Sequence, residues 1–409
     1  MMLKPSHHVI VGLEIGTTKI CAVVGRLQAE GVLNVVGVGQ CRSRGVRKGE
    51  IVDFKAATED IRRALAEAED MANLEIKSVF LGVTGAHVAG FNNRGRVHLP
   101  HGEREITESD VQEVVRNART LNLPAGRDVL HLIRQHFIVD GRSGVTKPVE
   151  MEGEQLELDV HVVHGMTSRL QLPIKAARSL QIDVEEVVFN GIASSLAVLS
   201  NQEKDLGALV IDLGAGVTEY AVYSERVVKH TGVIAVGGDH VTNDLAYGLK
   251  VPMSRAEALK IEHGSALMAP EVRGRTLRLP SETGLPDRTV NLEHLHRIMS
   301  LRLEETFQII AEDLERTGLL DYLRAGVVLC GGGSRVPGIH RLAERVFGLP
   351  ASTGRTRAIS GLVATLDQPE FATGIGLVRF GSFHLGRTRR NTGLASRIAR
   401  TLGGIFQTS

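Results

Sequence analysis

Short apolar runs separated by glycine and polar residues fill the first part of the chain. β-Branched residues dominate 9–15, 20–25 and 32–38, and each run is too short for an ordinary helix. Turn-forming residues lie between the runs. The pattern therefore predicts three consecutive strands that form a meander.

A helical pattern follows from 55 to 72. Ile61, Leu65 and Ala68 recur at intervals of three or four residues, and charged residues occupy the opposite face. A single apolar face of this kind indicates an amphipathic helix packed on a sheet. Residues 78–83 are again apolar and predict the strand that closes this unit.

The pattern changes between 85 and 165. Short predicted strands and many polar turns surround one predicted helix, and Thr107 and Asp110 mark its start with the spacing of a capping box. We interpret this stretch as an α+β subdomain inserted into the first half of the chain.

The second half of the chain repeats the plan of the first half. Residues 208–213, 219–223 and 226–236 predict three strands, with a glycine turn after the first of them. In both halves an apolar strand leads to an acid, an apolar residue and a glycine, as in Glu14-Ile15-Gly16 and Asp212-Leu213-Gly214. An internal duplication of this kind predicts two related lobes with a cleft between them.

Three glycine turns follow predicted strands, and they are called the first turn (16–19), the second turn (214–216) and the third turn (331–333) below. Where a Cβ is missing, backbone N–H groups can approach phosphate oxygens closely. A single such turn is more typical of an ordinary β-turn, because the chain contains 45 glycines. Together the three turns predict a site that clamps a nucleoside triphosphate, with ATP as the expected ligand.

Charged side chains beside these turns complement a triphosphate. Glu14 and Asp212 cannot bind phosphate themselves, but they are placed to hold Mg²⁺ through water molecules. Lys19 can neutralise the charge of the β- or γ-phosphate. The expected cofactors are therefore ATP and Mg²⁺.

Composition argues against several other classes of function. The 48 Lys and Arg residues nearly cancel the 47 Asp and Glu residues, and aromatic residues are few, so we expect no nucleic-acid partner. The three cysteines form no C-x-x-C pair, which indicates a reduced, cytosolic protein. No apolar stretch has the length of a membrane span, and the N-terminus lacks the pattern of a signal peptide. The histidine pairs His131/His136 and His161/His164 have no accompanying cysteine or carboxylate pattern, so we interpret them as strand or surface residues.

The end of the chain has a composition of its own. Asp and Glu are absent from 371 to 409, and arginines precede and flank a final apolar pattern. This pattern favours an amphipathic helix that binds anionic lipid, with a last helix docked on the core as the alternative. The residues expected at the membrane are Leu394, Arg397, Ile398, Arg400, Leu402, Ile405 and Phe406.

Five segments carry a resemblance to a known family: Gly12-Leu13-Glu14-Ile15-Gly16-Thr17-Thr18-Lys19, Gly37-Val38-Gly39, Ser43-Arg44-Gly45-Val46-Arg47-Lys48-Gly49, Ala193-Ser194-Ser195 and Phe371-Ala372-Thr373-Gly374-Ile375-Gly376-Leu377. They resemble the FtsA family of bacterial cell-division proteins, which belongs to the actin-like ATPase superfamily. The resemblance covers essentially the whole chain. It implies an α/β, actin-like fold, which is a duplicated ribonuclease H-like fold with two lobes, an interlobe nucleotide cleft and an inserted α+β subdomain.

The resemblance also implies which residues contact the nucleotide. These residues are Gly16, Thr17, Thr18, Lys19, Gly214, Ala215, Gly216, Gly237, Gly238, Glu257, Lys260, Gly331, Gly332 and Gly333. Without the resemblance, Glu257 and Lys260 are an ordinary i,i+3 ion pair on a helix surface. Asp239 lies near the phosphates by the same resemblance, but it could equally cap the following helix.

The second turn departs from the pattern of its relatives, Asp-x-Gly-Gly-Gly-Thr-x-Asp. Ala215, Val217 and Glu219 stand where the relatives have the second glycine, the threonine and the last aspartate. No residue near the start of 190–193 is recognisable as one that orients an attacking water molecule. We therefore expect ATP binding with slow or negligible hydrolysis, so that the nucleotide holds the lobes in a closure able to polymerise.

The resemblance implies a division of the chain into lobes and subdomains. Residues 1–84 and 166–195 are expected to form the first lobe (1A), 85–165 the inserted subdomain (1C), 196–225 and 304–380 the second lobe (2A), 226–303 an upper subdomain (2B), 381–392 a linker, and 393–409 the membrane-targeting helix.

The function implied by the resemblance is that of a cell-division adaptor. Such a protein assembles with itself into filaments, as a peripheral protein on the cytoplasmic face of the inner membrane at the division septum. It binds the C-terminal peptide of FtsZ on 226–303 and recruits later division proteins through 85–165. An actin-like pilus-assembly protein is the alternative with the same fold, and it lacks the C-terminal anchor. A small-molecule kinase of this fold would need a catalytic Asp facing a second substrate pocket.

Overall fold

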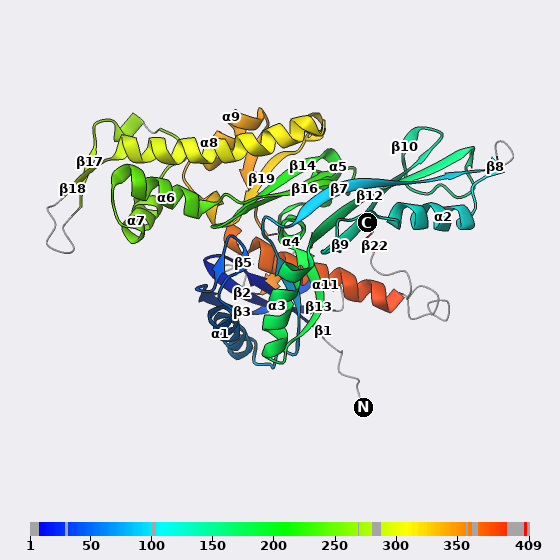
Figure 1. Ribbon diagram of the computed structural model, residues 1–409, viewed down its shortest axis with the longest axis horizontal. Coiled ribbons are helices and arrows are strands. Elements are labelled where there is room, and N and C mark those ends of the chain that lie inside the picture. The colour runs from blue at the N-terminus through cyan, green and yellow to red at the C-terminus, as the bar shows by residue number, and fades with distance from the viewer. Residues whose placement is uncertain are drawn as a thin grey trace.

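The computed structural model describes residues 8–28, 32–99, 104–268, 270–279, 288–356, 359–361, 367–390 and 405–406. Two sheets form the centres of two lobes, and an elongated subdomain extends sideways from their junction (Figure 1). None of the helices in the described part of the chain is long and apolar enough to cross a membrane.

The first lobe is built on a six-stranded sheet in the order β13-β6-β1-β2-β3-β21. β1 pairs with β2 antiparallel and with β6 parallel, which confirms the predicted meander and its closing strand. The strands are β1 (His8–Ile15), β2 (Lys19–Leu27), β3 (Leu33–Arg42), β6 (Ser78–Val83), β13 (Asp183–Phe189) and β21 (Ile359–Gly361).

The second lobe repeats this arrangement in a five-stranded sheet, β16-β15-β14-β19-β20. β14 is antiparallel to β15 and parallel to β19, as β1 is to β2 and β6. The predicted duplication is therefore confirmed at the level of strand order. The strands are β14 (Ala208–Leu213), β15 (Thr218–Ser224), β16 (Val227–Ile234), β19 (Gly326–Cys330) and β20 (Ala351–Thr353).

Helices cover the outer faces of both sheets. In the first lobe α1 begins after Asp53, whose carboxylate accepts a hydrogen bond from the N–H of Ala56, and its apolar face packs on the sheet as predicted. The remaining helices and short strands of the lobes are α1 (Phe54–Ala72), β4 (Val46–Arg47), β5 (Glu50–Ile51), α3 (Thr167–Ser179), α5 (Asn201–Leu206), α6 (Gly238–Leu249), α7 (Met253–His263), β17 (Thr276–Leu279), β18 (Arg288–Asn291), α8 (Leu292–Arg316) and α9 (Ile339–Phe347).

The inserted subdomain has its own apolar core between one helix and an antiparallel sheet in the order β10-β9-β12-β7. The predicted capping box is confirmed, since Thr107 and Asp110 bond each other's backbone N–H at the start of α2. Its elements are β7 (Ala89–His98), β8 (Arg104–Glu105), α2 (Glu108–Arg119), β9 (Arg127–Val139), β10 (Arg142–Val145), β11 (Glu152–Gly153) and β12 (Gln155–Met166).

Two helices, α4 (Asn190–Val198) and α11 (Ala372–Arg390), cross between the lobes; α4 is buried, and α11 is mostly buried up to Gly381. They share one core with residues of both sheets, including Val23 of the first and Val210 of the second. At their crossing Gly376 lies directly against the backbone of Ala193, where a Cβ would overlap the carbonyl group. This close approach joins the two lobes.

The end of the predicted second lobe and the linker after it need correction. The stretch 381–390 was expected to be linker, but α11 continues through it to Arg390. The helix continues because Gly381 packs against Ile10 and Phe80, and Nδ1 of His384 lies 2.9 Å from the carboxylate of Glu186. β21 and α11 also lie on the sheet of the first lobe, so the chain returns to that lobe well before residue 380.

Both boundaries of the predicted upper subdomain, 226–303, divide structure that belongs together: the first separates β16 from its sheet, and the second falls inside α8. β16 pairs along its length with β15 and therefore belongs to the sheet of the second lobe. α8 runs without interruption across residues 303 and 304, because its buried face continues through Phe307 and Ile310. Because the apolar stripe continues along one face, the helix stays packed on the core past that boundary.

The predicted C-terminal helix is wrong at Ile405 and Phe406. These residues form the two-residue strand β22, which pairs parallel with β9 at Leu132 and Ile133. β10 pairs with β9 farther along, at Phe137 and Val139, so the backbone at Leu132 can accept another strand. The other residues of the expected helix lie outside the described residues.

Candidate functional site

A cleft of about 640 Å³ lies between the two sheets. The turn between β1 and β2 borders it on one side, and the turns that follow β14 and β19 border it on the other. All residues predicted to contact nucleotide or magnesium line this one cleft: Glu14, Gly16, Thr17, Thr18, Lys19, Asp212, Gly214, Ala215, Gly216, Gly237, Gly238, Glu257, Lys260, Gly331, Gly332 and Gly333.

The first turn is closed by a hydrogen bond from the N–H of Gly16 to the carbonyl of Lys19, at 2.9 Å. The ammonium group of Lys19 donates to the carbonyl of Glu370, lies 3.8 Å from the carboxylate of Glu14 and stacks over Phe371. Burial disfavours its charge, but the surrounding acids, Glu14 first among them, outweigh burial and raise the pKa of Lys19. Lys19 therefore presents a partly buried, charged ammonium to the cleft.

The second turn packs against the turn that begins α6. The N–H of Gly238 donates to the carbonyl of Gly214 at 3.0 Å, and the N–H of Asp239 donates to the carbonyl of Ala215 at 2.8 Å. Gly237, not Asp239, is the cap residue of α6, so the expectation that Asp239 caps the helix is wrong. Asp239 instead lies in the first helical turn and lines the cleft.

The two lobes meet where Gly216 of the second turn faces the hairpin β4–β5. A Cβ on Gly216 would lie 2.7 Å from the Cα of Lys48 and would overlap the hydroxyl of Thr17. The hairpin is fixed to the first lobe, because the N–H of Gly49 donates to that hydroxyl at 2.9 Å. The backbone N–H of Arg44 donates to the fully buried carboxylate of Asp60 at 2.8 Å.

Asp212 is buried at the cleft and the side chain of Glu14 is only 14% exposed, and burial raises the pKa of each carboxyl. One oxygen of Glu14 accepts no hydrogen bond from the described residues, and an oxygen of Asp212 accepts one from Thr373 at 2.9 Å. Two neighbouring acids with spare acceptor capacity fit a hydrated cation between them. No three His, Cys, Asp or Glu side chains of the described ranges converge as a metal cage. This donor set suits Mg²⁺, which keeps several of its water ligands.

The third turn and α7 form the other end of the cleft. Lys260 and Glu257 form an ion pair at 2.7 Å, and Lys260 also donates to the carbonyl of Gly238 at 3.1 Å. The Lys260 side chain is only 14% exposed, so this pair is part of the cleft wall and not an ordinary surface pair. Apolar residues complete this end with surfaces suited to a flat ring: Val241, Ile261, Met299, Leu303, Val336 and Pro337.

Sequence reasoning did not assign eight polar residues that also line the cleft: Thr84, Asn190, Thr218, Glu219, Thr306, Arg335, Glu370 and Thr373. The amide oxygen of Asn190 is buried without a hydrogen-bond partner among the described residues. Burial, then the charge of Asp212, raises the pKa of Glu219 well above its usual range. A signal for Glu219 existed in the sequence, because a β-hairpin through the second turn places it directly opposite Asp212.

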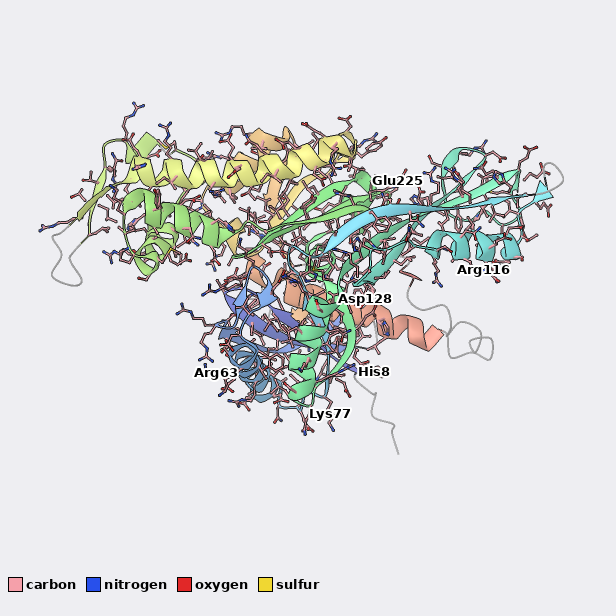
Figure 2. All side chains as sticks on the ribbon, viewed as in Figure 1. His8, Arg63, Lys77, Arg116, Asp128 and Glu225 are labelled. Atoms are coloured by element: carbon pink, nitrogen blue, oxygen red, sulfur yellow. The ribbon has the colours of Figure 1, made fainter. Side chains whose placement is uncertain are left out.

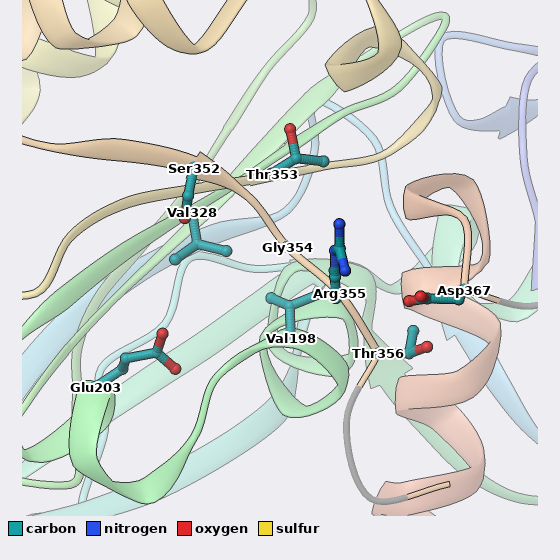
Figure 3. A pocket seen from close by; sticks show the side chains of 9 residues that line it. All are labelled: Val198, Glu203, Val328, Ser352, Thr353, Gly354, Arg355, Thr356 and Asp367. Atoms are coloured by element: carbon teal, nitrogen blue, oxygen red, sulfur yellow. The ribbon is translucent and has the colours of Figure 1, made fainter. Parts of the chain in front are cut away.

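A second cavity of about 440 Å³ shares no lining residue with the cleft (Figure 3). Val198 and Val328 contribute its apolar wall, and Glu203, Arg355 and Asp367 contribute charges of both signs. Glu203 already accepts hydrogen bonds from the backbone N–H and the hydroxyl of Ser200, the N-cap residue of α5, as part of a capping box. None of the predicted site residues lies there.

The four histidines considered as metal ligands are strand residues, two on β9 and two on β12. The ring of His131, for example, has a structural role, because it accepts the N–H of Phe189 at 2.9 Å. The predicted membrane residues 394–402 lie outside the described residues.

Comparison with known proteins identifies the family. The family model described as "Cell division protein FtsA" matches residues 209–376, and that of the "SHS2 domain inserted in FTSA" matches residues 85–164. Cell division protein FtsA of Pseudomonas aeruginosa is 36% identical over 92% of this chain and 90% of its own. The protein of the same name from Borreliella burgdorferi is 37% identical over 92% of this chain and 91% of its own.

Solved structures share the fold at low sequence identity. A structure of a PilM–PilN type IV pilus biogenesis complex has a TM-score of 0.63 at 18% identity, covering 91% of this chain and 98% of that chain. MreB5 of Spiroplasma citri bound to AMPPNP has a TM-score of 0.58 at 15% identity, covering 94% and 99%. These likenesses confirm the actin-like fold. The relatives found by sequence identify the family within that fold. The chain belongs to the family of cell division protein FtsA.

Proposed function

We propose that the cleft binds ATP and that nucleotide holds the two lobes together in a protein of cell division. The observation that carries this proposal is the convergence of all the predicted nucleotide residues on one cleft. In the proposed complex the first turn and Lys19 hold the phosphates from the first lobe, and the second turn holds them from the other. The third turn, Glu257 and Lys260 receive the adenosine.

The acids Glu14 and Asp212 would hold Mg²⁺ through its water ligands. The metal would neutralise charge on the β- and γ-phosphates when it is bound. Magnesium would also relieve the cost of burying two neighbouring carboxyl groups in their charged form. Holding the metal is the only role we propose for these two carboxylates. Neither is proposed to act as an acid or a base.

We expect ATP hydrolysis to be slow. An attacking water molecule needs a group that orients it and accepts its proton. Glu219 lines the cleft, but burial and the charge of Asp212 raise its pKa well above its usual range, which disfavours the carboxylate form that would accept a proton. Asn190 can orient water through its amide oxygen without acting as a base. The site is therefore better suited to holding ATP than to consuming it.

The tail is the proposed attachment to the cytoplasmic face of the inner membrane. Its apolar residues and arginines would enter anionic lipid as a helix, and lipid would have to replace the pairing of β22 with β9. One short helix binds a bilayer weakly, whereas a filament presents many copies side by side. ATP-dependent self-assembly would in this way convert weak contacts into stable attachment at the septum.

The proposed partners follow from membership of the family. The C-terminal peptide of FtsZ would bind the upper subdomain, and later division proteins would bind the inserted subdomain. A pull-down with the FtsZ peptide tests the first of these contacts, with a pilus inner-membrane peptide as the comparison. Capture by the pilus peptide in place of the FtsZ peptide would contradict the cell-division role.

Assembly on liposomes tests nucleotide and membrane binding together. The full chain should co-sediment with anionic liposomes when ATP and Mg²⁺ are present. Ile398→Glu should reduce co-sedimentation at least tenfold while ATP binding is unchanged, because it places a charge on the apolar face. Lys19→Ala should weaken ATP binding and, through lost assembly, liposome binding. Undiminished co-sedimentation of Ile398→Glu would contradict the role of the tail.

A further inference from the structure

The inserted subdomain contacts both lobes, although its chain leaves and re-enters only the first. It is inserted between β6 and α3, yet β7, β9 and β12 all pack against β16 of the second lobe. β7 and β16 lie next to each other in Figure 1, and Figure 2 labels Glu225 where the second lobe meets the subdomain. His136 of the subdomain lies 3.3 Å from the carboxylate of Glu225.

The contact with β16 is a connected set of polar bonds, which we call the joint. The amide N–H of Asn92 donates to the carbonyl of Lys229 at 3.1 Å, and that of Gln135 donates to the carbonyl of Val228 at 2.8 Å. The ring of His161 lies 2.7 Å from the amide oxygen of Asn92 and 2.8 Å from the hydroxyl of Thr231.

These bonds fix the donor and acceptor roles of His161. Its side chain is fully buried, and burial, followed by His230 and His131, lowers its pKa to about 3, so the ring is neutral. The amide oxygen of Asn92 can only accept, so Nδ1 of His161 carries the proton and Nε2 accepts from the hydroxyl of Thr231. These groups bond one another across the contact, so a shift of β16 against the subdomain would break several of the bonds at once.

The approach of the two surfaces at the joint is close. A Cβ on Gly90 would lie 2.5 Å from the hydroxyl of Thr231 and 2.9 Å from the ring of His161. A buried polar group that loses its partner is destabilising, so the joint resists sliding.

β16 leads from the joint to the nucleotide cleft. The strand ends at Ile234, and the hydroxyl of Thr218 donates to the carbonyl of Val236 at 2.8 Å, just before Gly237 and Gly238 line the cleft. The segment with these two glycines is hydrogen-bonded to the second turn. One continuous strand therefore connects the joint with groups proposed to surround the phosphates.

The other side of the subdomain is fastened to the first lobe. His131 of β9 accepts the N–H of Phe189, the last residue of β13, and β9 packs against β13. A rotation of one lobe relative to the other must consequently turn the subdomain or strain the joint.

We propose that the inserted subdomain is a clasp between the lobes, and that its joint with β16 couples the nucleotide cleft to the orientation of the subdomain. This rests on the proposed nucleotide binding. The two states are a closed one, with nucleotide between the lobes and the joint intact, and an open one with the joint altered. Because such coupling is reciprocal, a partner protein that binds the subdomain changes the affinity of the cleft for ATP by the same factor.

Hydrogen exchange of the full chain with and without ATP and Mg²⁺ tests the clasp. ATP should slow amide exchange in 89–93 and 227–231 in the native protein. Asn92→Ala removes the three bonds that Asn92 makes in the joint, to Lys229, His161 and Gln135, and it should abolish this response and speed the release of a fluorescent ATP analogue about fivefold to tenfold.

Asn93→Ala is the matched control. The Asn93 amide bonds only within the subdomain in the described structure, at the carbonyls of Ala118 and Thr120. This variant should keep the native exchange response and release rate. If ATP binds the native protein but leaves exchange in 89–93 unchanged, or if Asn92→Ala responds as the native protein does, the clasp is overturned while nucleotide binding stands. A native protein that binds no ATP overturns both proposals.

Discussion

Alanine at position 216 should weaken ATP binding at least tenfold, which corresponds to about 1.4 kcal/mol. The reason is steric, because the new Cβ would lie 2.7 Å from the Cα and 2.9 Å from the N of Lys48 in the other lobe. Backbone atoms cannot rotate away as a side chain can. The hairpin that contains Lys48 is also held to the first lobe through Thr17 and Asp60. In the Gly216→Ala variant the two lobes would therefore stay too far apart to contact one triphosphate from both sides.

Isothermal titration calorimetry with ATP and Mg²⁺ measures this effect, and Ala215→Gly is the matched control. The control alters the neighbouring position of the same turn but removes a Cβ in place of adding one, and it restores the glycine of the relatives' pattern. It should bind ATP at least as tightly as the native chain. Native affinity in Gly216→Ala would show that the lobes do not need to approach at this turn.

Much of the central fold could be predicted because its strands are buried on both faces. The strands Ser78–Val83 and Ala208–Leu213 were predicted with their observed bounds. Such strands are short continuous apolar runs that end at glycine or polar residues, and both signals are local. The duplication was visible for the same reason, because each copy repeats the strand, the acid and the glycine turn.

Features that depend on distant partners could not be predicted. β21 has only three residues and gains its place by pairing with β3, more than three hundred positions earlier in the chain. α11 extends beyond Phe380 because Phe80 and Glu186 receive its later residues, whereas its local composition of glycine, serine and arginine is typical of a linker. A short pattern cannot report such a partner.

The candidate site divides in the same way. The glycine turns and Lys19 were recognisable from local sequence, because phosphate contact needs those residue types. Glu257 and Lys260 required the family resemblance, since an i,i+3 pair has no feature that distinguishes a cleft wall from a surface. Asn190 was passed over because asparagine at the start of an apolar helix has no distinguishing pattern, and only the fold brings it to the cleft.

The crossing of α4 and α11 gives the second large prediction: Gly376→Ala should lower the free energy of unfolding by about 3 kcal/mol. Helix propensity alone predicts the opposite sign, since alanine is favoured over glycine in a helix by about 1 kcal/mol. Packing should prevail, because the new Cβ would overlap the carbonyl group of Ala193 and would lie 3.0 Å from its Cα. The two helices would have to move apart, and with them the core that both lobes share.

Urea unfolding followed by circular dichroism measures the sign, and Gly248→Ala in α6 is the control with the same substitution. The Cβ added at Gly248 meets only the end of the Ile298 side chain, which can change rotamer, so propensity should dominate and the midpoint should stay equal or rise. Opposite shifts of the urea midpoint in the two variants would show that the close contact at Gly376 holds the two lobes together. They would exclude a general intolerance of alanine as the cause. A midpoint for Gly376→Ala at or above that of the native chain would mean that α4 and α11 can separate at little cost, and the rigid crossing between the lobes would have to be abandoned.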